Sequence, residues 1–283
     1  MRFIGLVVAF FLFFGCAKKD ELKISANTWV GYTPLFYADA KGWLADKNIK
    51  LIHTVSLNES LLLYNENLIS AMAVTQYEAM LAKKKVYPVI LLDKSYGADM
   101  VMANFPLNKL YKEKNINVYL EIDSINSLLF KYFLKQYPID KNRLNIKNRD
   151  QAKIISSKYT SPSIVVTYSP YDNILEKKGF NTIASTRTSK HLIVLDAVFS
   201  DSENIKKHLK QFKYLKKVLK RALKALNDDP REFYKTVKPY LVDNCTYEKF
   251  SKELKNIKWL IGKESESDEI LKALNLKKDR LIK

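Results

Sequence analysis

Residues 27–44 read NTWVGYTPLFYADAKGWL, and this stretch places large aromatic side chains around the start of a short predicted helix. Thr33 is typical of a helix N-cap, and Gly42 is typical of the residue at which a helix ends. Trp29 and Tyr32 come just before the helix, where a half-buried strand is expected to run out into a loop. Because such rings combine a flat apolar body with a polar tip, they are suited to contact with a small molecule.

Strand-like runs alternate with helical runs along most of the chain. The strand-like runs are LKISAN (22–27), IKLIHTVS (49–56), ISAMAV (69–74), YPVILLD (87–93), DMVMANF (99–105), INVYLEI (116–122), LNIKN (144–148), SIVVTY (163–168) and HLIVLDAVF (191–199). This alternation predicts βαβ units and an α/β fold with mixed parallel sheets.

Polar and aromatic residues recur at the carboxyl ends of these strands, directly before helices. In open α/β sheets this edge borders the crevice in which ligands bind, and helix N-termini there offer free N–H groups. Thr75 also opens a predicted capping box with Glu78. The candidate ligand-binding residues are Trp29, Tyr32, Thr75, Ser95, Tyr96, Gly97, Asp99, Glu121, Ser124, Tyr168 and Ser169.

Each candidate residue also has an ordinary structural explanation. Trp29 fits a buried core position, Thr75 a helix cap and Gly97 a turn that needs a positive φ. Asp99 is explained equally well as an acidic residue in a turn, and Glu121 as an exposed charge at the end of a strand. The repeated placement, and not any single residue, therefore favours a binding cleft.

The sequence lacks the motifs of an enzyme or a metal protein. It contains no G-x-S-x-G elbow and no glycine-rich nucleotide loop. His53, His191 and His208 are scattered without metal-ligand spacing, so neither a metal site nor a cofactor is expected. We expect a binding protein that does not catalyse a reaction.

The first fifteen residues have the pattern of an export signal. Arg2 precedes the apolar run FIGLVVAFFLFF, which is too short to span a membrane as a helix. Gly15 and Cys16 then resemble the lipobox of bacterial lipoproteins, which predicts cleavage before Cys16 and lipidation of its sulfur. The alternative is a plain secretory signal with a chance cysteine. Either reading predicts export, and lipidation predicts anchoring to the cell membrane or to the periplasmic side of the outer membrane.

The chain is strongly basic, with 48 lysines and arginines against 30 acidic residues and a formal net charge of +18. Anionic ligands, an anionic membrane surface or a solvated lysine coat would each explain this excess. The lysines are spread along the chain without a nucleic-acid-binding motif, and this pattern favours the coat. Since export also removes nucleic acid as a partner, none is expected.

The C-terminal third is predicted to be helical. Between residues 205 and 226, apolar residues repeat at helical spacing while lysines occupy the other face. Such a helix fits packing of its apolar face on the fold, and the alternative is a helix lying on a membrane surface.

Four blocks resemble the type II periplasmic solute-binding proteins of the nitrate, sulfonate, taurine and thiamine-pyrimidine-precursor group. Relatives often have glutamate where Ser169 stands, and the resemblance runs from about residue 22 to residue 200. The matching residues are Trp29, Gly31, Tyr32, Pro34, Leu35 and Gly42, then Thr75 and Glu78, then Asp93, Ser95, Gly97, Ala98 and Asp99, and finally Tyr168, Ser169 and Pro170.

The resemblance implies two lobes that enclose a small solute. Residues 22–101 and 191–283 are expected in lobe one and residues 103–188 in lobe two, with crossings near 101–104 and 187–191. Such a protein delivers its solute to a membrane permease powered by an ATPase. The rings of Trp29 and Tyr32 are then expected on the lobe-one wall of the cleft.

The resemblance also assigns chemical roles and leaves alternatives open. Thr75, Ser95 and Ser124 would donate hydrogen bonds, and Glu121 or Asp99 would select by charge. Nitrate, alkanesulfonate, taurine, a hydroxymethylpyrimidine and an amino-acid-like zwitterion all remain possible solutes, although the quoted blocks lack an arginine for a small strong anion. A ligand-sensing lipoprotein and a synthase or dehydratase on the same fold are the alternatives to uptake.

Overall fold

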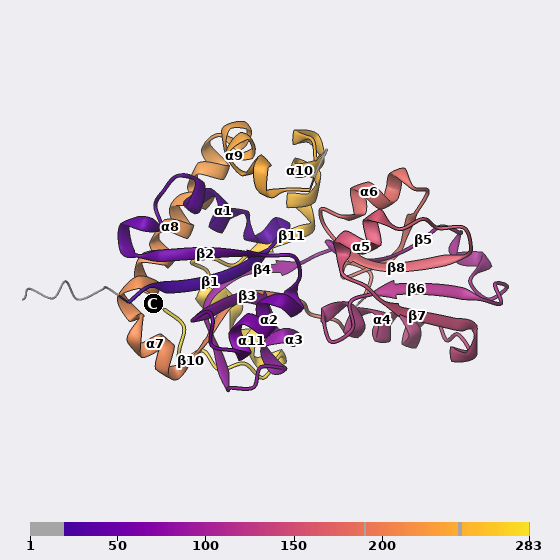
Figure 1. The fold of residues 1–283 in the computed structure, drawn as a ribbon, viewed down its shortest axis with the longest axis horizontal. Coiled ribbons are helices and arrows are strands. Elements are labelled where there is room, and N and C mark those ends of the chain that lie inside the picture. The colour runs from indigo at the N-terminus through magenta and orange to yellow at the C-terminus, as the bar shows by residue number, and fades with distance from the viewer. Residues whose placement is uncertain (1–19, 190, 243–244, 283) are drawn as a thin grey trace, which may run out of the picture.

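The computed structural model of the protein describes residues 20–189, 191–242 and 245–282 and has a two-lobed α/β fold (Figure 1). The predicted signal peptide, residues 1–15, and the predicted lipidation site, Cys16, lie outside the described residues. Within the described ranges, no helix is both long enough and apolar enough to cross a membrane.

Lobe one is built around a six-stranded sheet with the strand order β11-β4-β10-β3-β1-β2. β1 pairs in parallel with β2 and β3, whereas β10 runs antiparallel to β3 and β4. Helices cover the sheet, so its central strands are apolar runs with both faces buried. The strands are β1 (Leu22–Asn27), β2 (Ile49–Thr54), β3 (Ala71–Thr75), β4 (Val86–Ser95), β10 (Leu195–Asp201) and β11 (Ile257–Trp259).

Lobe two contains a five-stranded sheet with the order β7-β6-β8-β5-β9. β6 is parallel to β7 and β8, and β5 is antiparallel to β8 and β9. The expected α/β fold with mixed sheets is therefore confirmed. The strands are β5 (Asp99–Ala103), β6 (Ile116–Leu120), β7 (Leu144–Asn148), β8 (Ser163–Tyr168) and β9 (Asn181–Ser185).

The chain passes between the two sheets twice. β4 ends at Ser95 and β5 begins at Asp99, so the first passage covers residues 96–98. The crossing expected at 101–104 is wrong in its position, because Val101 lies inside β5 and pairs with both β8 and β9. The second passage connects the end of β9 to the start of β10.

The helices surround both sheets. α4, α5 and α6 belong to lobe two, and the rest belong to lobe one (Figure 1). Their bounds are α1 (Thr33–Ala40), α2 (Leu57–Asn65), α3 (Gln76–Met80), α4 (Ile125–Gln136), α5 (Gln151–Ser156), α6 (Asp172–Lys177), α7 (Ser202–Lys207), α8 (Leu209–Asp228), α9 (Pro230–Val237), α10 (Tyr247–Glu253) and α11 (Asp268–Ala273).

The long basic helix α8 packs into lobe one. Phe212, Leu215, Leu219 and Leu226 are buried, and the helix contacts α1 and β4. Packing of the apolar face therefore explains the amphipathic pattern, with most of the lysines left in water.

The start of α1 differs from the expected cap. Tyr32 precedes the helix, because a turn of 3-10 helix at Val30–Tyr32 comes first. The hydroxyl of Thr33 donates to the carbonyl oxygen of Val30 at 2.7 Å, so Thr33 is inside the helix and is not its N-cap. The helix ends as expected before Gly42, whose φ is +72°.

Candidate functional site

A small cavity lies between the lobes. It has a volume of about 10 Å³, room for roughly one water molecule. Lobe one contributes most of the wall, and Asp99 and Tyr168 contribute from lobe two. The lining residues are Asn27, Trp29, Tyr32, Leu57, Thr75, Asp99, Tyr168 and Asp196.

The structure brings together Trp29, Tyr32, Thr75, Asp99 and Tyr168 from the sequence-predicted set around this one cavity. They come from residues 29 to 168 of the chain and from both lobes. The strand-end argument explains this meeting, because the carboxyl ends of β1, β3 and β8 all face the cleft.

Two aromatic rings face each other across the cleft. The rings of Trp29 and Tyr168 are 5.8 Å apart between centroids and nearly perpendicular, at 77°, which is a favourable edge-to-face arrangement. The side-chain amide of Asn27 donates to the hydroxyl of Tyr168 at 2.8 Å. These contacts join lobe one to lobe two directly at the cavity.

Strand register places two carboxyls side by side in lobe one. Asp196 of β10 pairs with Thr75 of β3 on one side and with Asp93 of β4 on the other. Directly opposed residues in a sheet have Cβ atoms about 5 Å apart, so two negative charges here would repel strongly. The hydroxyl of Tyr32 donates to Asp196 at 2.6 Å.

Gly31 makes room for this arrangement. A Cβ atom on Gly31 would lie 2.0 Å from Oδ2 of Asp93 and 2.3 Å from the indole nitrogen of Trp29. Only glycine therefore allows the backbone to pass between the acid and the indole.

Burial raises the pKa of these acids. It is the largest cause for Asp93 and Asp196, whose pKa values lie well above the ordinary range. The neighbouring carboxyl adds to the rise in each case, through Asp99 for Asp93 and through Asp93 for Asp196. The indole of Trp29 and the hydroxyl of Tyr32 oppose it. Burial also raises the pKa of Asp99 to about 7.

A second pair of acids lies beside the cavity, at the N-terminus of α4. Thr75 and Glu78 form the expected capping box, which is confirmed. The other oxygen of Glu78 accepts from the backbone N–H of Ile125 in lobe two at 2.7 Å. Burial raises the pKa of Glu78 to about 7 and that of Glu121 to about 8.

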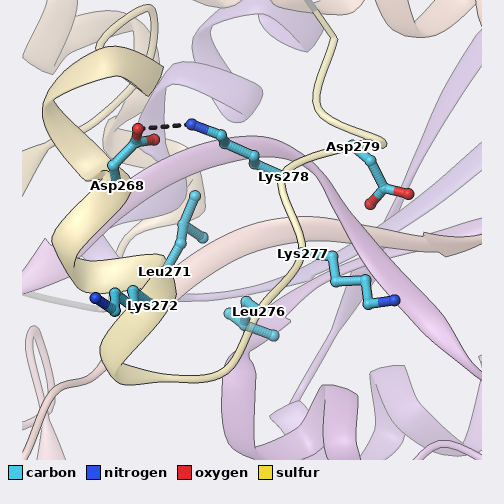
Figure 2. A pocket seen from close by; sticks show the side chains of 7 residues that line it. All are labelled: Asp268, Leu271, Lys272, Leu276, Lys277, Lys278 and Asp279. Atoms are coloured by element: carbon cyan, nitrogen blue, oxygen red, sulfur yellow. Dashed lines mark hydrogen bonds and ion pairs between the residues drawn. The ribbon is translucent and has the colours of Figure 1, made fainter.

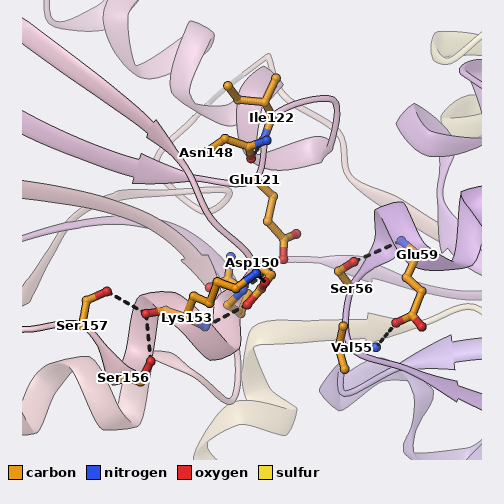
Figure 3. Close-up of polar contacts among 11 residues, drawn as sticks. Val55, Ser56, Glu59, Glu121, Ile122, Asn148, Asp150, Lys153, Ser156 and Ser157 are labelled. Carbon is orange, nitrogen blue, oxygen red and sulfur yellow. Dashed lines mark hydrogen bonds and ion pairs between the residues drawn. The ribbon is translucent and has the colours of Figure 1, made fainter.

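Glu121 follows β6, and its side chain extends toward Asp150, next to the start of α5 (Figure 3). Its Oε1 accepts from the backbone N–H of Gln151 at 3.2 Å, and its Oε2 is buried without a hydrogen bond. Ser124 caps α4 and donates to the carbonyl oxygen of Glu121 at 2.8 Å. Neither residue lines the cavity itself.

Ser95, Tyr96 and Gly97 lie at the first passage between the lobes. The hydroxyls of Ser95 and Thr186 are 2.8 Å apart, and the N–H of Gly97 donates to the Thr186 hydroxyl at 2.7 Å. The ring of Tyr96 is 40% exposed and contacts the guanidinium of Arg187. These residues connect the two passages by hydrogen bonds and a cation–ring contact, and they do not line the cavity.

Ser169 is buried at the end of β8, next to this passage. Its N–H donates to the carbonyl oxygen of Ala98 at 2.9 Å, while its hydroxyl oxygen has no hydrogen-bond partner. Ser169 therefore contacts the first passage through its backbone and does not line the cavity.

A larger hollow of about 640 Å³ lies in lobe one, between α11 and the C-terminal segment (Figure 2). It is a wide surface depression, and Lys278 pairs with Asp268 across it at 2.6 Å. None of the sequence-predicted residues lines it, so the inter-lobe cavity is the better candidate site.

Sequence reasoning missed Asn27, Leu57 and Asp196 among the lining residues. Asp196 carries the clearest missed signal, because it is an acid inside an otherwise apolar strand, HLIVLDAVF. A buried charge is costly, and such a residue is expected to have a specific partner or function.

Comparison of the sequence with protein-family models and with curated proteins found no match. Solved structures with the same fold include the alkanesulfonate-binding protein SsuA from Xanthomonas axonopodis pv. citri bound to MOPS. It has a TM-score of 0.69 and 13% identity over 92% of this chain and 95% of that one. Another is the ligand-binding component of an ABC-type import system from Staphylococcus aureus with zinc bound, with a TM-score of 0.66 and 13% identity over 93% and 96%.

The nitrate-binding protein NrtA from Synechocystis PCC 6803 is also similar, with a TM-score of 0.60 and 10% identity over 81% of this chain and 68% of that one. The chain thus has the two-lobed fold of periplasmic solute-binding proteins. At these identities the likeness shows a common fold, and the function must be argued from the site.

Proposed function

We propose that this protein is the solute-binding component of an ABC uptake transporter, exported and anchored to the membrane through a lipid on Cys16. The observation that carries the proposal is the cavity walled by both lobes, where Trp29 and Tyr32 meet Asp99 and Tyr168. The likeness in fold to the ligand-binding component of an ABC-type import system and to an alkanesulfonate-binding protein supports it.

The solute enters while the lobes are apart, and closure then brings both walls against it. Only contacts that require both lobes favour the closed state, since a ligand shifts a conformational equilibrium by its differential affinity. The two short passages, 96–98 and 186–194, are the segments about which the lobes turn. The closed form then docks on the permease, and the ATPase drives transport.

The solute is small and polar. Two carboxyls, of Asp99 and Asp196, and two phenols, of Tyr32 and Tyr168, line the cavity, and none of its lining residues is a lysine or an arginine. Of the solute classes left open by the sequence, small anions such as nitrate fit this lining least well. Zwitterions and neutral or cationic polar solutes fit it better.

A thermal-shift screen of small polar solutes tests the proposal. A true solute at 100 times its dissociation constant adds about 2.7 kcal/mol to the free energy of unfolding. Trp29→Ala is expected to remove the shift, because the ring contact on the lobe-one wall is lost. Trp43→Ala is the control, since Trp43 packs near Tyr37 and Arg221 and does not line the cavity.

Two outcomes would contradict the proposal. Unchanged affinity of Trp29→Ala for a solute that binds the original protein would remove Trp29 from the site. Chemical turnover of that solute by the purified protein would replace the receptor with an enzyme.

A further inference from the structure

We propose that the solute is a compact organic cation, held between Asp99 of lobe two and Asp196 of lobe one. The inference rests on the proposed function, because it assigns the chemical class of the solute that the cleft takes. It is carried by unpaired carboxyl oxygens at the cavity, the absence of a basic partner for them and the rings beside them.

The two acids present buried oxygens without partners. Asp99 is 3% exposed and Asp196 is 2% exposed, and both line the cavity. Oδ2 of Asp99 and Oδ2 of Asp196 make no hydrogen bond. A buried carboxyl left in this state is costly, so the site has a strong preference for a donor that reaches both oxygens.

The basic side chains of the described residues do not pair with these acids. Among the described residues, no ion pair joins Asp93, Asp99 or Asp196 to a lysine, arginine or histidine. This is notable in a chain with a formal net charge of +18. The basic residues are placed elsewhere, so a bound cation would take the place of the proton that burial favours on these acids.

The remaining walls suit an organic cation better than a metal ion. The rings of Trp29 and Tyr168 line the cavity, and aromatic faces attract a cation and its methyl groups, while Leu57 adds apolar contact. In the described part of the chain, no three histidine, cysteine or acidic residues are grouped so that they could hold a metal ion. The free volume of about 10 Å³ holds roughly one water molecule, so the lobes must part to admit any organic solute, and a compact cation requires the least parting.

The inference predicts the direction in which solute affinity changes with pH. Tyr32, Asp93, Asp99 and Glu78 are the titratable groups that act on Asp196, and burial raises the pKa of Asp99 to about 7. A cation therefore displaces a proton when it binds near neutral pH, and its affinity rises with pH. An anion held by protonated carboxyls would instead bind more tightly as the pH falls.

Isothermal titration calorimetry of the full chain at pH 6, 7 and 8 tests the inference. The probes are methylammonium, guanidinium and tetramethylammonium chlorides, compared with sodium nitrate, methanesulfonate, taurine and zinc chloride. At least one organic cation is expected to bind, with close to one proton released and an affinity gain of up to about tenfold per pH unit.

Matched variants locate the binding. Asp99→Asn and Asp196→Asn keep the shape of the side chain and remove the charge, and each is expected to weaken cation binding at least about tenfold. Glu266→Gln removes an exposed acid of lobe one and is expected to leave binding unchanged. Equal loss in all three would assign the effect to net charge and overturn the inference.

The results separate the inference from the proposed function. Tight binding of an anion, taurine or zinc without an organic cation would overturn the cation assignment and leave a solute receptor. Binding of none of the probes would also overturn the assignment, and the wider thermal-shift screen would then decide the proposed function alone.

Discussion

Gly31 shows how one missing side chain shapes the cleft. Gly31→Ala places a Cβ 2.0 Å from Oδ2 of Asp93 and 2.3 Å from the indole nitrogen of Trp29, so both must move. We expect a loss of about 1–3 kcal/mol in the free energy of unfolding. Solute binding is expected to weaken as well, because Trp29 lines the cavity. Urea unfolding and calorimetry measure the two effects.

A double variant supplies the control for Gly31. Removing the Asp93 carboxyl leaves space for the new methyl group, so Gly31→Ala is expected to cost less in an Asp93→Ala background. If the cost is the same in both backgrounds, the crowding against Asp93 does not explain it.

For single residues, the sequence predicted some members of the site and missed others, and the difference has a physical reason. Trp29 and Tyr168 stand next to strand ends, and their residue types are typical of ligand contacts. Asp196 stands within β10, and its importance follows from the register that places it between Thr75 and Asp93. The register between strands that are far apart in the chain depends on tertiary structure and cannot be predicted from the sequence alone.

Hydrogen bonds link the two passages between the lobes to each other. The Thr186 hydroxyl lies 2.8 Å from the Ser95 hydroxyl and accepts from the N–H of Gly97 at 2.7 Å. Thr186→Val keeps the shape and leaves the N–H of Gly97 without this partner. We expect a loss of about 1–3 kcal/mol in the free energy of unfolding and altered closure, measured by urea unfolding and by small-angle scattering.

Thr186→Ser is the control, because serine retains the hydroxyl. It is expected to keep the closure behaviour of the original protein. Equal scattering profiles for Thr186→Val and the original protein would show that these hydrogen bonds do not govern the passage.

At the scale of elements, strand existence was predictable and strand direction was not. The run SIVVTY (163–168) is β8 itself, and LKISAN (22–27) is β1. The apolar run 191–199 does not reveal that β10 runs antiparallel between β3 and β4. The crossing near 101–104 was misplaced because an apolar run does not show to which sheet it belongs.

A hydrogen bond between the lobes, away from the cavity, involves a further group of acids. The amide of Asn173 in α6 donates to Glu253 in α10, which joins the lobes away from the cavity. Burial raises the pKa of Glu253 to about 8, and the nearby Asp172 adds to the rise. Burial raises the pKa of Asp172 to about 6.

These shifts predict opening at high pH. Below the ordinary pKa of 4.5 for glutamate, Glu253 is protonated whether the lobes are closed or open. Between that value and about 8 the closed form holds the proton more tightly, so rising pH favours opening. Scattering is expected to show a larger radius of gyration at pH 8 than at pH 5. Glu253→Gln is expected to flatten this change, since its carbonyl oxygen still accepts from Asn173.

The cleft acids predict the pH dependence of global stability in the same direction. Their raised pKa values, about 7 for Glu78 and Asp99 and about 8 for Glu121, mean that the folded protein binds more protons than the unfolded chain. The free energy of unfolding should therefore fall between about pH 5 and pH 8, by up to roughly 1.4 kcal/mol per pH unit for each such carboxyl. Urea unfolding across this range measures the slope.

Matched variants test which carboxyls cause this slope. Glu121→Gln should reduce the slope, and Glu66→Gln, at an exposed ion pair with Lys83, should not. Stability that rises across this range would mean that the cleft carboxyls are ionised and already paired in the folded protein.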